Sequence, residues 1–362
     1  MASIDRRTGT TILLAMSNSR EKTLKVGIIG AGGIVRLRHL PGLASLENVV
    51  VAAVANRIRQ SAETICSEFS LDATVYANWR ELVAQPDLDI IWIGTHPNLH
   101  REITLAALDA GKHVFCQARM ALDLAEAESM LLAATSHPEL VTMLCPPPYG
   151  LRYDETIHKL LSENSLGTLH RVSVISRNSG FLDPNAPPHW RQLREANGLN
   201  ILTLGIHVEI LQRWFGDIAS VQASSRIWTP ERSGREIKTP DDLFVIANFA
   251  NGALGTLDLS ATDPGPARES ITIIGEKGHL HYDYIRGEIT LIHPDGHSEI
   301  LTVPSADDRP WQVERDFITA VRNPDAQRPH PTFRDGVAYM RVVQAVHEAL
   351  GTKSTASLVL PN

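Results

Sequence analysis

Short apolar runs alternate with amphipathic segments over the first 145 residues of the chain. The runs are KVGIIG, VVVAAVA, DIIWIG, HVFC and LVTMLC, and the segments between them include REITLAALDAG and DLAEAESMLLAAT, in which Leu and Ala recur every three or four residues. Short apolar runs indicate buried strands, and the longer spacing indicates helices. Strands that alternate with helices predict β-α-β units and therefore a parallel sheet.

The pattern changes after three consecutive prolines at residues 146–148, which can continue neither a helix interior nor a strand ladder. One helical segment, ETIHKLLSENSLG, is followed by strand-like runs: HRVSVISR, SVQASSRIW, LFVIANFA, ALGTLDLSA, SITIIGEKGHLHYDY and EITLIHPDGHSEILTV. The turn dipeptides NG and DG separate some of these runs. This half of the chain predicts a largely antiparallel sheet, closed by a last helix over residues 333–350.

Together the two patterns predict an α/β protein of two domains, since 362 residues exceed what one hydrophobic core usually supports. We expect an N-terminal Rossmann domain, that is, a doubly wound parallel sheet, over residues 23–146. A C-terminal α/β domain with a large, mostly antiparallel open sheet is expected over residues 147–362. Residues 1–22 carry only one brief apolar run and are interpreted as a disordered tail.

Composition and charge indicate which kinds of molecule the protein binds. The chain is 43% hydrophobic and 21% charged, which is ordinary for a globular protein. A formal net charge of -7 provides no basic surface for nucleic acid, so a small molecule is expected instead. No run approaches the roughly 20 apolar residues of a membrane span. The three cysteines show neither disulfide nor metal spacing, which suits the reducing cytoplasm.

A glycine-rich loop follows the first predicted strand and opens a helix. Its sequence is Gly30-Ala31-Gly32-Gly33-Ile34. Gly30 permits a tight turn, and Gly32 lets the backbone approach a pyrophosphate at the helix N-terminus. In this strand, loop and helix context the loop predicts a bound dinucleotide. A glycine turn without a ligand is the alternative.

The end of the second strand bears on the choice between NAD and NADP. An NAD site usually has Asp or Glu there, to accept hydrogen bonds from the adenosine ribose, but this chain has Asn56, followed by Arg57 and Arg59. The missing carboxylate removes repulsion of a 2′-phosphate, and the arginines could pair with it. We therefore favour NADP over NAD. Alternatively, both arginines are solvated or stack on adenine in either cofactor.

The chain resembles the Gfo/Idh/MocA family, the glucose–fructose oxidoreductase and inositol dehydrogenase group, over about residues 24–350. The resemblance rests on the linked segments VGIIGAGGIVRLRHLPGL, IGTHPNLHREITLAALDAGKHVFCQARMALDLAEAESML, NGLNILTLGIHVEILQRWFGD and GEKGHLHYD. It implies a Rossmann domain followed by an α/β domain with an open sheet, whose face often forms a dimer or tetramer interface. A homodimer or homotetramer is therefore expected.

Two positions depart from the usual pattern of that family. Its Glu-Lys-Pro becomes Gln117-Ala118-Arg119 here, and its Asp four residues before a His becomes Thr203, four residues before His207. Ala118 can neither titrate nor donate, and Thr203 can hydrogen-bond but carries no charge near neutral pH. His207 is the remaining group suited to proton transfer, although a histidine on an amphipathic helix often only packs.

Further candidates follow from the same resemblance. Arg119 brings a positive charge to the crevice at the carboxyl ends of the strands, where it could clamp a carboxylate or stabilise an oxyanion, or it points to solvent. The other expected cofactor contacts are Thr95, His96, Asn98, His100 and Gln117, and the expected substrate contacts are Tyr149, Tyr153, His189 and Arg191. His96 and His100 are four residues apart, with Cys116 on a nearby strand, but their segment matches a helix start of the family and no third ligand is suitably spaced, so no metal is expected.

Three functions remain open at this stage. The first is an NAD(P)-dependent oxidoreductase acting on a sugar, cyclitol or related polyol or keto compound, with His207 as acid and base and Arg119 or Gln117 holding substrate. The second is a nucleotide-using lyase, glycoside-cleaving enzyme or epimerase with no net redox change, which the absent lysine motivates. The third is a non-catalytic nucleotide or sugar sensor, since fold does not determine function.

Overall fold

The first domain is built on a six-stranded parallel sheet in a computed structural model that describes residues 22–147, 152–303, 311–323, 325, 328–352 and 356–358. The strand order is β3-β2-β1-β4-β5-β6, so the order reverses between β1 and β4. The strands are β1 (Leu24–Ile29), β2 (Val49–Ala55), β3 (Thr74–Tyr76), β4 (Ile90–Ile93), β5 (His113–Cys116) and β6 (Thr142–Leu144). The parallel, doubly wound sheet expected from the alternating pattern is confirmed.

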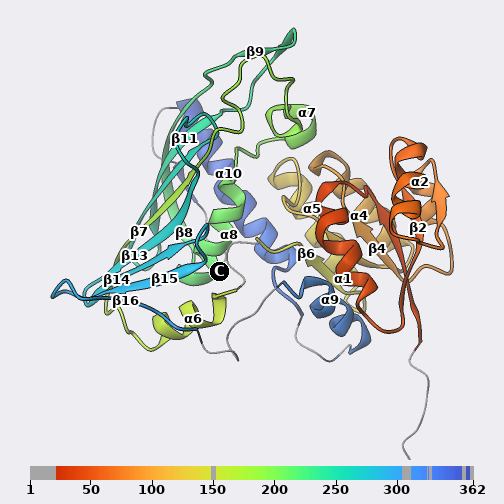
Figure 1. Cartoon of the computed structure of the whole chain (residues 1–362), viewed down its shortest axis with the longest axis horizontal. Helices are drawn as coiled ribbons and strands as arrows, with labels where there is room; N and C mark the ends of the chain where they lie inside the picture. Colours follow the sequence, from red (N-terminus) through yellow and green to blue (C-terminus); the bar gives the residue numbers. More distant parts are fainter. Residues whose placement is uncertain are drawn as a thin grey trace, which may run out of the picture.

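Helices cover both faces of this sheet, as the amphipathic segments predicted (Figure 1). They are η1 (Val35–His39), a π-helical turn, α1 (Leu40–Ala44), α2 (Arg59–Glu68), α3 (Trp79–Val83), η2 (Pro97–Leu99), α4 (His100–Asp109) and α5 (Leu124–Ser136). The start of α5 is capped: Asp123 accepts from the backbone N–H of Glu126 at 2.9 Å, and Glu126 accepts from that of Leu122 at 3.0 Å. These two bonds set where the chain leaves the sheet after β5.

The second domain contains a nine-stranded sheet in the order β16-β15-β14-β13-β7-β12-β11-β8-β17. Its strands β7 and β12 are parallel, and every other pair is antiparallel, which confirms the expected mostly antiparallel sheet. The strands are β7 (Leu169–Arg177), β8 (Ile218–Arg226), β11 (Asp242–Phe249), β12 (Leu254–Ser260), β13 (Arg268–Gly275), β14 (Gly278–Asp283), β15 (Glu288–Ile292), β16 (Ser298–Ile300) and β17 (Ala356–Ser357), and a separate hairpin pairs β9 (Glu231–Arg232) with β10 (Arg235–Glu236).

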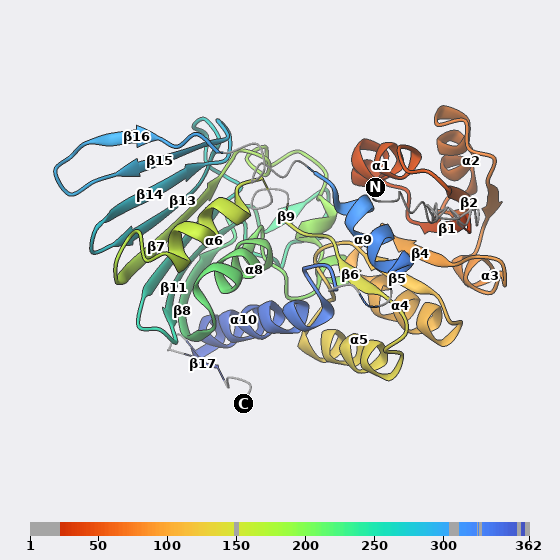
Figure 2. The ribbon, with the colours of Figure 1, turned by 90° about the horizontal axis from the view of Figure 1, so that it is seen from below.

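Helices lie on one face of the large sheet and leave the other open (Figure 2). The helical elements of this half are α6 (Asp154–Ser162), η3 (Trp190–Gln192), α7 (Arg194–Asn197), α8 (Leu204–Phe215), α9 (Val313–Arg322) and α10 (Phe333–Thr352). The last helix was expected near residues 333–350 and is present. α10 packs against α8 and β8 and also against α5 of the first domain, so it joins the two domains.

Helix α9 belongs by packing to the first domain, although it follows the large sheet in sequence. It lies beside α1 (Figure 2), and Phe317 meets Trp92 of β4 and Phe115 of β5 edge-on, with ring centroids 5.7 Å apart in both cases. The range 147–362, expected for the second domain, therefore includes a helix that completes the first. No helix among the described residues is long and apolar enough to cross a membrane.

Candidate active site

The glycine loop after β1 has the shape of a phosphate cradle. Gly30 has a φ of +85°, and a Cβ there would lie 2.6 Å from the backbone nitrogen of Thr95, so only glycine fits this turn. At Gly32 and Gly33 the opposite holds, because no atom lies within 4 Å of the place where a Cβ would be. The loop is closed towards β4 and open on its other side, which leaves room for a pyrophosphate at the helix start. Ile34, the next residue, is exposed.

Asn56, at the end of β2, ties the glycine loop to the neighbouring strand. Its Oδ1 accepts from the backbone N–H of Ala31 at 2.7 Å, and its Nδ2 donates to Ser61 Oγ at 3.0 Å. The next side chain, Arg57, is exposed. The carboxamide therefore occupies the position of the usual ribose-binding carboxylate while carrying no negative charge.

The predicted cofactor residues after β4 differ in how far they are buried. Thr95 is half-buried, and His96 and Asn98 are exposed. His100, by contrast, is fully buried, and its ring nitrogens lie 2.9 Å from the carbonyl oxygen of Arg119 and 3.0 Å from that of Thr95. Burial lowers the pKa of His100. The structure thus uses the His100 ring inside the fold, as a support for the segment after β5.

That segment after β5, residues 117–119, forms a corner between the two domains. Gln117 is buried, and its side-chain nitrogen meets Nε2 of His39; Ala118 is half-buried, and the peptide between Ala118 and Arg119 is cis. Arg119 is only 1% exposed, and its guanidinium donates to the backbone carbonyl oxygen of Leu202 in the second domain. The arginine is therefore directed across the domain boundary and away from solvent.

A polar cluster faces this corner from the second domain. His207 on α8 is fully buried, and its Nε2 lies 3.9 Å from Oε2 of Glu269 on β13. Oε1 of Glu269 accepts from Ser176 Oγ at 2.9 Å, and that hydroxyl lies 3.0 Å from Thr203 Oγ1. The cluster thus links the helix and the sheet directly beside the charge of Arg119.

The pKa values of the two titratable groups in this cluster, His207 and Glu269, are shifted in opposite directions. Burial, followed by the positive charge of Arg119, lowers the pKa of His207 to about 3. Burial raises the pKa of Glu269 to about 7, and the hydrogen bond from Ser176 partly opposes this rise. Near neutral pH, His207 is consequently neutral, whereas Glu269 is the group that exchanges a proton.

The segment around η3 brings further predicted residues to the crevice between the domains. Trp190 stacks on His96 of the first domain, with ring centroids 4.4 Å apart and planes 13° apart, and the Arg191 guanidinium lies 4.5 Å from the centre of the Trp190 ring. Burial, followed by the charge of Arg191, lowers the pKa of both His96 and His189. His96, His189 and Arg191 thus gather around Trp190, and their role in binding a ligand stays a prediction.

Tyr153, one of the two predicted tyrosines, does not join this group. Tyr153 is buried in the second domain, where its hydroxyl donates to the backbone carbonyl oxygen of Gly287 at 2.5 Å and its ring meets that of Tyr282 edge-on. Tyr149 lies outside the described residues. The environment of Tyr153 is that of a packed core residue.

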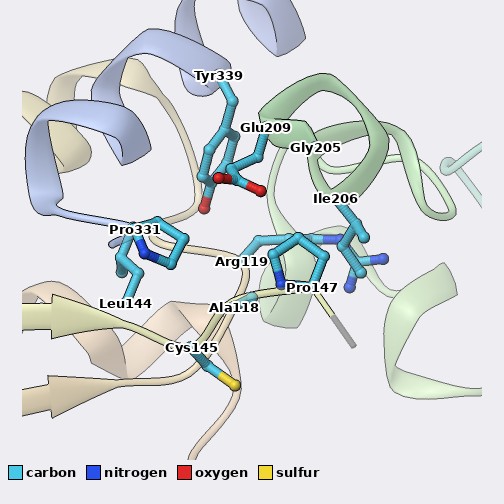
Figure 3. Close-up of a pocket in the computed structure, with 10 residues that line it drawn as sticks. All are labelled: Ala118, Arg119, Leu144, Cys145, Pro147, Gly205, Ile206, Glu209, Pro331 and Tyr339. Carbon is cyan, nitrogen blue, oxygen red and sulfur yellow. The ribbon is translucent and has the colours of Figure 1, made fainter. Parts of the chain in front are cut away.

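A narrow pocket lies where the corner meets α8 and α10, with space for about one water molecule. Figure 3 shows Glu209 and Tyr339 pointing into it from the two helices, above Ala118 and Arg119. Glu209 is paired with Arg213 at 3.0 Å, and the Tyr339 hydroxyl accepts from the backbone N–H of Met120 at 2.5 Å. This pocket is too small for a sugar. The Tyr339 hydroxyl in it holds the chain directly after residues 117–119.

Comparison with known proteins decides the family. The sequence pattern described as an oxidoreductase family with an NAD-binding Rossmann fold, Gfo/Idh/MocA, matches residues 24–144, and the Gfo/Idh/MocA C-terminal domain matches residues 155–281. The chain belongs to the Gfo/Idh/MocA family. The expected resemblance and the assignment as an oxidoreductase with an NAD-binding fold are thereby confirmed.

Relatives of this Gfo/Idh/MocA protein include dehydrogenases of an inositol and of an anhydrosugar. Myo-inositol 2-dehydrogenase of Thermotoga maritima is 26% identical over 278 residues, 75% of this chain and 78% of the relative, and levoglucosan dehydrogenase of Pseudarthrobacter phenanthrenivorans is 25% identical over 296 residues, 73% and 75% respectively. Among solved structures, levoglucosan dehydrogenase in complex with NADH and levoglucosan superposes with a TM-score of 0.82 at 22% identity, covering 93% of this chain and 99% of that one. The structural likeness confirms the fold.

Glu269 is the member of the site that the sequence analysis of this Gfo/Idh/MocA protein missed. Its signal was the alternation along β13: Ile271 and Ile273 are fully buried, and Glu269 lies on their side of the strand, so a carboxylate faces the helix-covered side of the sheet. Its partner Ser176 is set by the register of β13 against β7. Among the described residues, no group of three or more His, Cys, Asp or Glu side chains could hold a metal ion.

Proposed function

We propose that this protein is an NAD(P)-dependent oxidoreductase that acts on a sugar, cyclitol or related polyol or keto compound through a non-standard catalytic site. The observation that carries the proposal is the pairing of an open glycine cradle after β1 with the Glu269 and His207 pair across the corner at residues 117–119. The inositol and levoglucosan dehydrogenases among the relatives support the substrate class.

The residues at the corner suggest how the site works without the usual lysine. A nicotinamide, when bound, supplies the hydride acceptor or donor. Arg119 holds a buried positive charge next to His207, which would stabilise the negative charge that develops on a reacting oxygen. Gln117, held by His39, positions the end of β5, and Thr203 contributes a hydroxyl to the polar cluster. Ala118 leaves space where a titratable side chain would otherwise stand.

A substrate screen tests this function. Purified protein is mixed with NAD⁺ or NADP⁺ and a panel of cyclitols, aldoses, anhydrosugars and sugar acids, and with the reduced cofactors and the corresponding keto compounds. We expect a change in reduced-nicotinamide absorbance with at least one pair of compounds. Cofactor binding without turnover over the whole panel would contradict the proposal, and cleaved or epimerised product without net cofactor change would indicate the redox-neutral alternative.

We also propose a preference for NADP, carried by Arg57 beside the uncharged Asn56. The Arg57→Ala variant is expected to raise the KM for NADP⁺ about tenfold and to leave that for NAD⁺ nearly unchanged, because a charge-assisted phosphate contact contributes about 1.5 kcal/mol. Arg59→Ala is the matched control, since Arg59 is already paired with Glu63 at 2.8 Å. Steady-state kinetics with both cofactors measure the effect, and an equal change for both cofactors would contradict the preference.

We further propose a homodimer or homotetramer that associates through the open face of the nine-stranded sheet. Figure 2 shows helices on one face only, and Phe244 of β11 is 44% exposed on the other. Light scattering coupled to size exclusion is expected to give a mass of two or four chains. Phe244→Glu should shift that mass towards the monomer, because it buries a charge in the contact. A monomeric wild-type protein would contradict this proposal.

The cysteines support a cytoplasmic location, which is also part of the proposal. Cys116 and Cys145 are buried, Cys66 is half-buried, and all three are free. Burial raises the pKa of each thiol, so all three stay protonated and unreactive near neutral pH. Cell fractionation followed by immunodetection tests the location, and recovery outside the cytoplasmic fraction would contradict it.

A further inference from the structure

Only one of the two carboxylate oxygens of Glu269 accepts a hydrogen bond within the described structure. Its side chain is 13% exposed and stands near the start of β13, on the side of the sheet that α8 covers. Oε1 is held by Ser176, whereas Oε2, directed at His207, is buried and has no hydrogen-bond partner among the described residues. A buried carboxylate oxygen without a donor is costly, and a ligand hydroxyl would satisfy it.

The groups around Glu269 and His207 come from several distant segments of the chain. His207 approaches from α8, Ser176 from β7, and Thr203 from the residue before α8. Tyr284, after β14, donates its backbone N–H to the Glu269 carbonyl oxygen at 2.9 Å, and its ring lies parallel to that of His207 at 6.3 Å. Arg119 adds a positive charge beside His207 from the corner. The carboxylate is thus in contact with hydroxyl and imidazole groups at the boundary between the domains.

The distance from Glu269 to His207 matches that of two groups bridged by one oxygen atom. At 3.9 Å, Oε2 and Nε2 are too far apart for a direct hydrogen bond, but a hydroxyl oxygen can lie about 2.8 Å from both atoms at once. His207 would donate to or accept from that oxygen as a neutral ring, and Glu269 would accept its hydrogen. The two side chains together therefore bind a hydroxyl group better than either does alone.

We infer that Glu269 is the catalytic base of this enzyme and accepts the proton of the reacting substrate hydroxyl, in place of the carboxylate that Thr203 lacks. The inference rests on the proposed function. In the oxidative direction, the O–H bond breaks and its proton goes to Glu269, while the C–H bond breaks and its hydride, with both electrons, goes to the oxidised nicotinamide. A carbonyl group forms on the substrate. In the reverse direction, Glu269 returns the proton to the new hydroxyl.

The energetics of the cluster agree with this role. A base works best when its pKa lies near the working pH, and the pKa of Glu269, raised by burial to about 7, meets this condition. His207, whose pKa is lowered to about 3, stays neutral and acts as a hydrogen-bonding partner of the hydroxyl. Ser176 and Thr203 act as positioning residues: the Ser176 hydroxyl donates to Oε1 and the Thr203 hydroxyl contacts that of Ser176, which leaves Oε2 for the substrate.

The Glu269→Gln variant tests the inference by kinetics. We expect kcat for the oxidation found in the substrate screen to fall about 10²- to 10⁴-fold, because the amide keeps the shape but accepts no proton. In the wild type, kcat/KM should rise with pH through about 7, as Glu269 ionises, and this rise should be absent from the variant. Glu276→Gln, an exposed carboxylate after the same strand, is the matched control and should retain wild-type kinetics.

The Ser176→Ala variant tests the ionisation of Glu269 through the pH midpoint of kcat/KM, which would stay unchanged if Glu269 had only a structural role. The hydroxyl stabilises the ionised carboxylate, so its removal raises the pKa of Glu269 and shifts the rise in kcat/KM to higher pH, by about 0.5–1 unit. Ser176→Thr retains a hydroxyl and should restore the original midpoint. If Glu269→Gln fails to fold, Glu269→Asp keeps a titratable carboxylate and should retain the pH dependence at a reduced rate.

The possible outcomes separate this inference from the proposed function. Turnover by wild-type protein together with unchanged kcat and pH profile in Glu269→Gln would overturn the role of Glu269 and leave the oxidoreductase in place. A wild-type protein that turns over no compound of the panel would overturn both. A pH profile that is unmoved by Ser176→Ala would also contradict the assigned ionisation.

Discussion

The Glu314→Ala variant is expected to lose about 2–6 kcal/mol of unfolding free energy, because the buried His39 and the half-buried Trp311 lose their acceptor at a cost of about 1–3 kcal/mol each. Glu314 on α9 is buried, with Oε1 2.5 Å from His39 Nδ1 and both oxygens 3.0 Å from Trp311 Nε1. The Gln117 side-chain nitrogen donates to the other ring nitrogen of His39, so Nδ1 carries the proton donated to Glu314. This network joins α9 to the first domain and to the corner of the site.

Urea unfolding monitored by tryptophan fluorescence measures the loss, with Arg315→Ala as the matched control. Arg315 is the next residue on α9, but it is exposed, so its replacement should change stability by no more than about 0.5 kcal/mol. Glu314→Ala should also weaken catalysis, since Gln117 loses its support. Equal stabilities of the two variants would show that the network contributes little to the fold.

The Gly198→Ala variant is expected to destabilise the protein by at least about 3 kcal/mol and to lower kcat/KM about 100-fold, because a misplacement near 1 Å at a reacting centre has an effect of this size. Gly198 has a φ of +60°, and a Cβ there would lie 2.1 Å from the carbonyl oxygen of Leu122 in the first domain. Leu199 N–H donates to the same oxygen at 2.7 Å. The added methyl group would therefore push apart the two segments that carry Arg119 and Leu202.

Gly216→Ala separates backbone conformation from this steric clash. Gly216 has a φ of +83°, but nothing lies within 4 Å of its Cβ position, so alanine there should cost only the conformational penalty of about 1–2 kcal/mol. Denaturant unfolding of both variants and steady-state kinetics measure the difference. If Gly198→Ala is no less stable than Gly216→Ala and equally active, the close approach to Leu122 does not hold the domains together.

The positions of the cofactor loop and the corner were predictable because their signals are local. Gly30 and Gly32 lie where a strand turns into a helix, and the turn chemistry is written in consecutive residues. The corner at residues 117–119 follows an apolar strand in the same way. His96 was expected in the ligand crevice because it follows the end of an apolar strand, and Arg191 because of the family resemblance. Both lie at the stack around Trp190, and their contact with a ligand stays a prediction.

The surroundings of these residues could not be predicted in the same way. His100 and Tyr153 have the residue types of binding groups, but the packing of neighbouring elements encloses them. Helix α9 has an amphipathic sequence that indicates a buried face, yet nothing local shows that this face covers Trp92 and Phe115 in the first domain. Whether a polar side chain faces a ligand or a carbonyl oxygen of the same chain depends on contacts between segments far apart in sequence.

Hydrophobic periodicity and turn residues were sufficient for the two kinds of sheet, because strand and helix periods differ and apolar faces must be buried. The turn residues also located the glycine loop, whereas the missing lysine and aspartate were recognised only through the family resemblance. Only the tertiary structure placed Glu269 at 3.9 Å from His207, through the register of β13 against β7 and the position of α8 on the covered face of the sheet (Figure 2). Proton-transfer chemistry depends on burial and charge at one point in space, where residues from distant segments meet, and a linear pattern carries no such information.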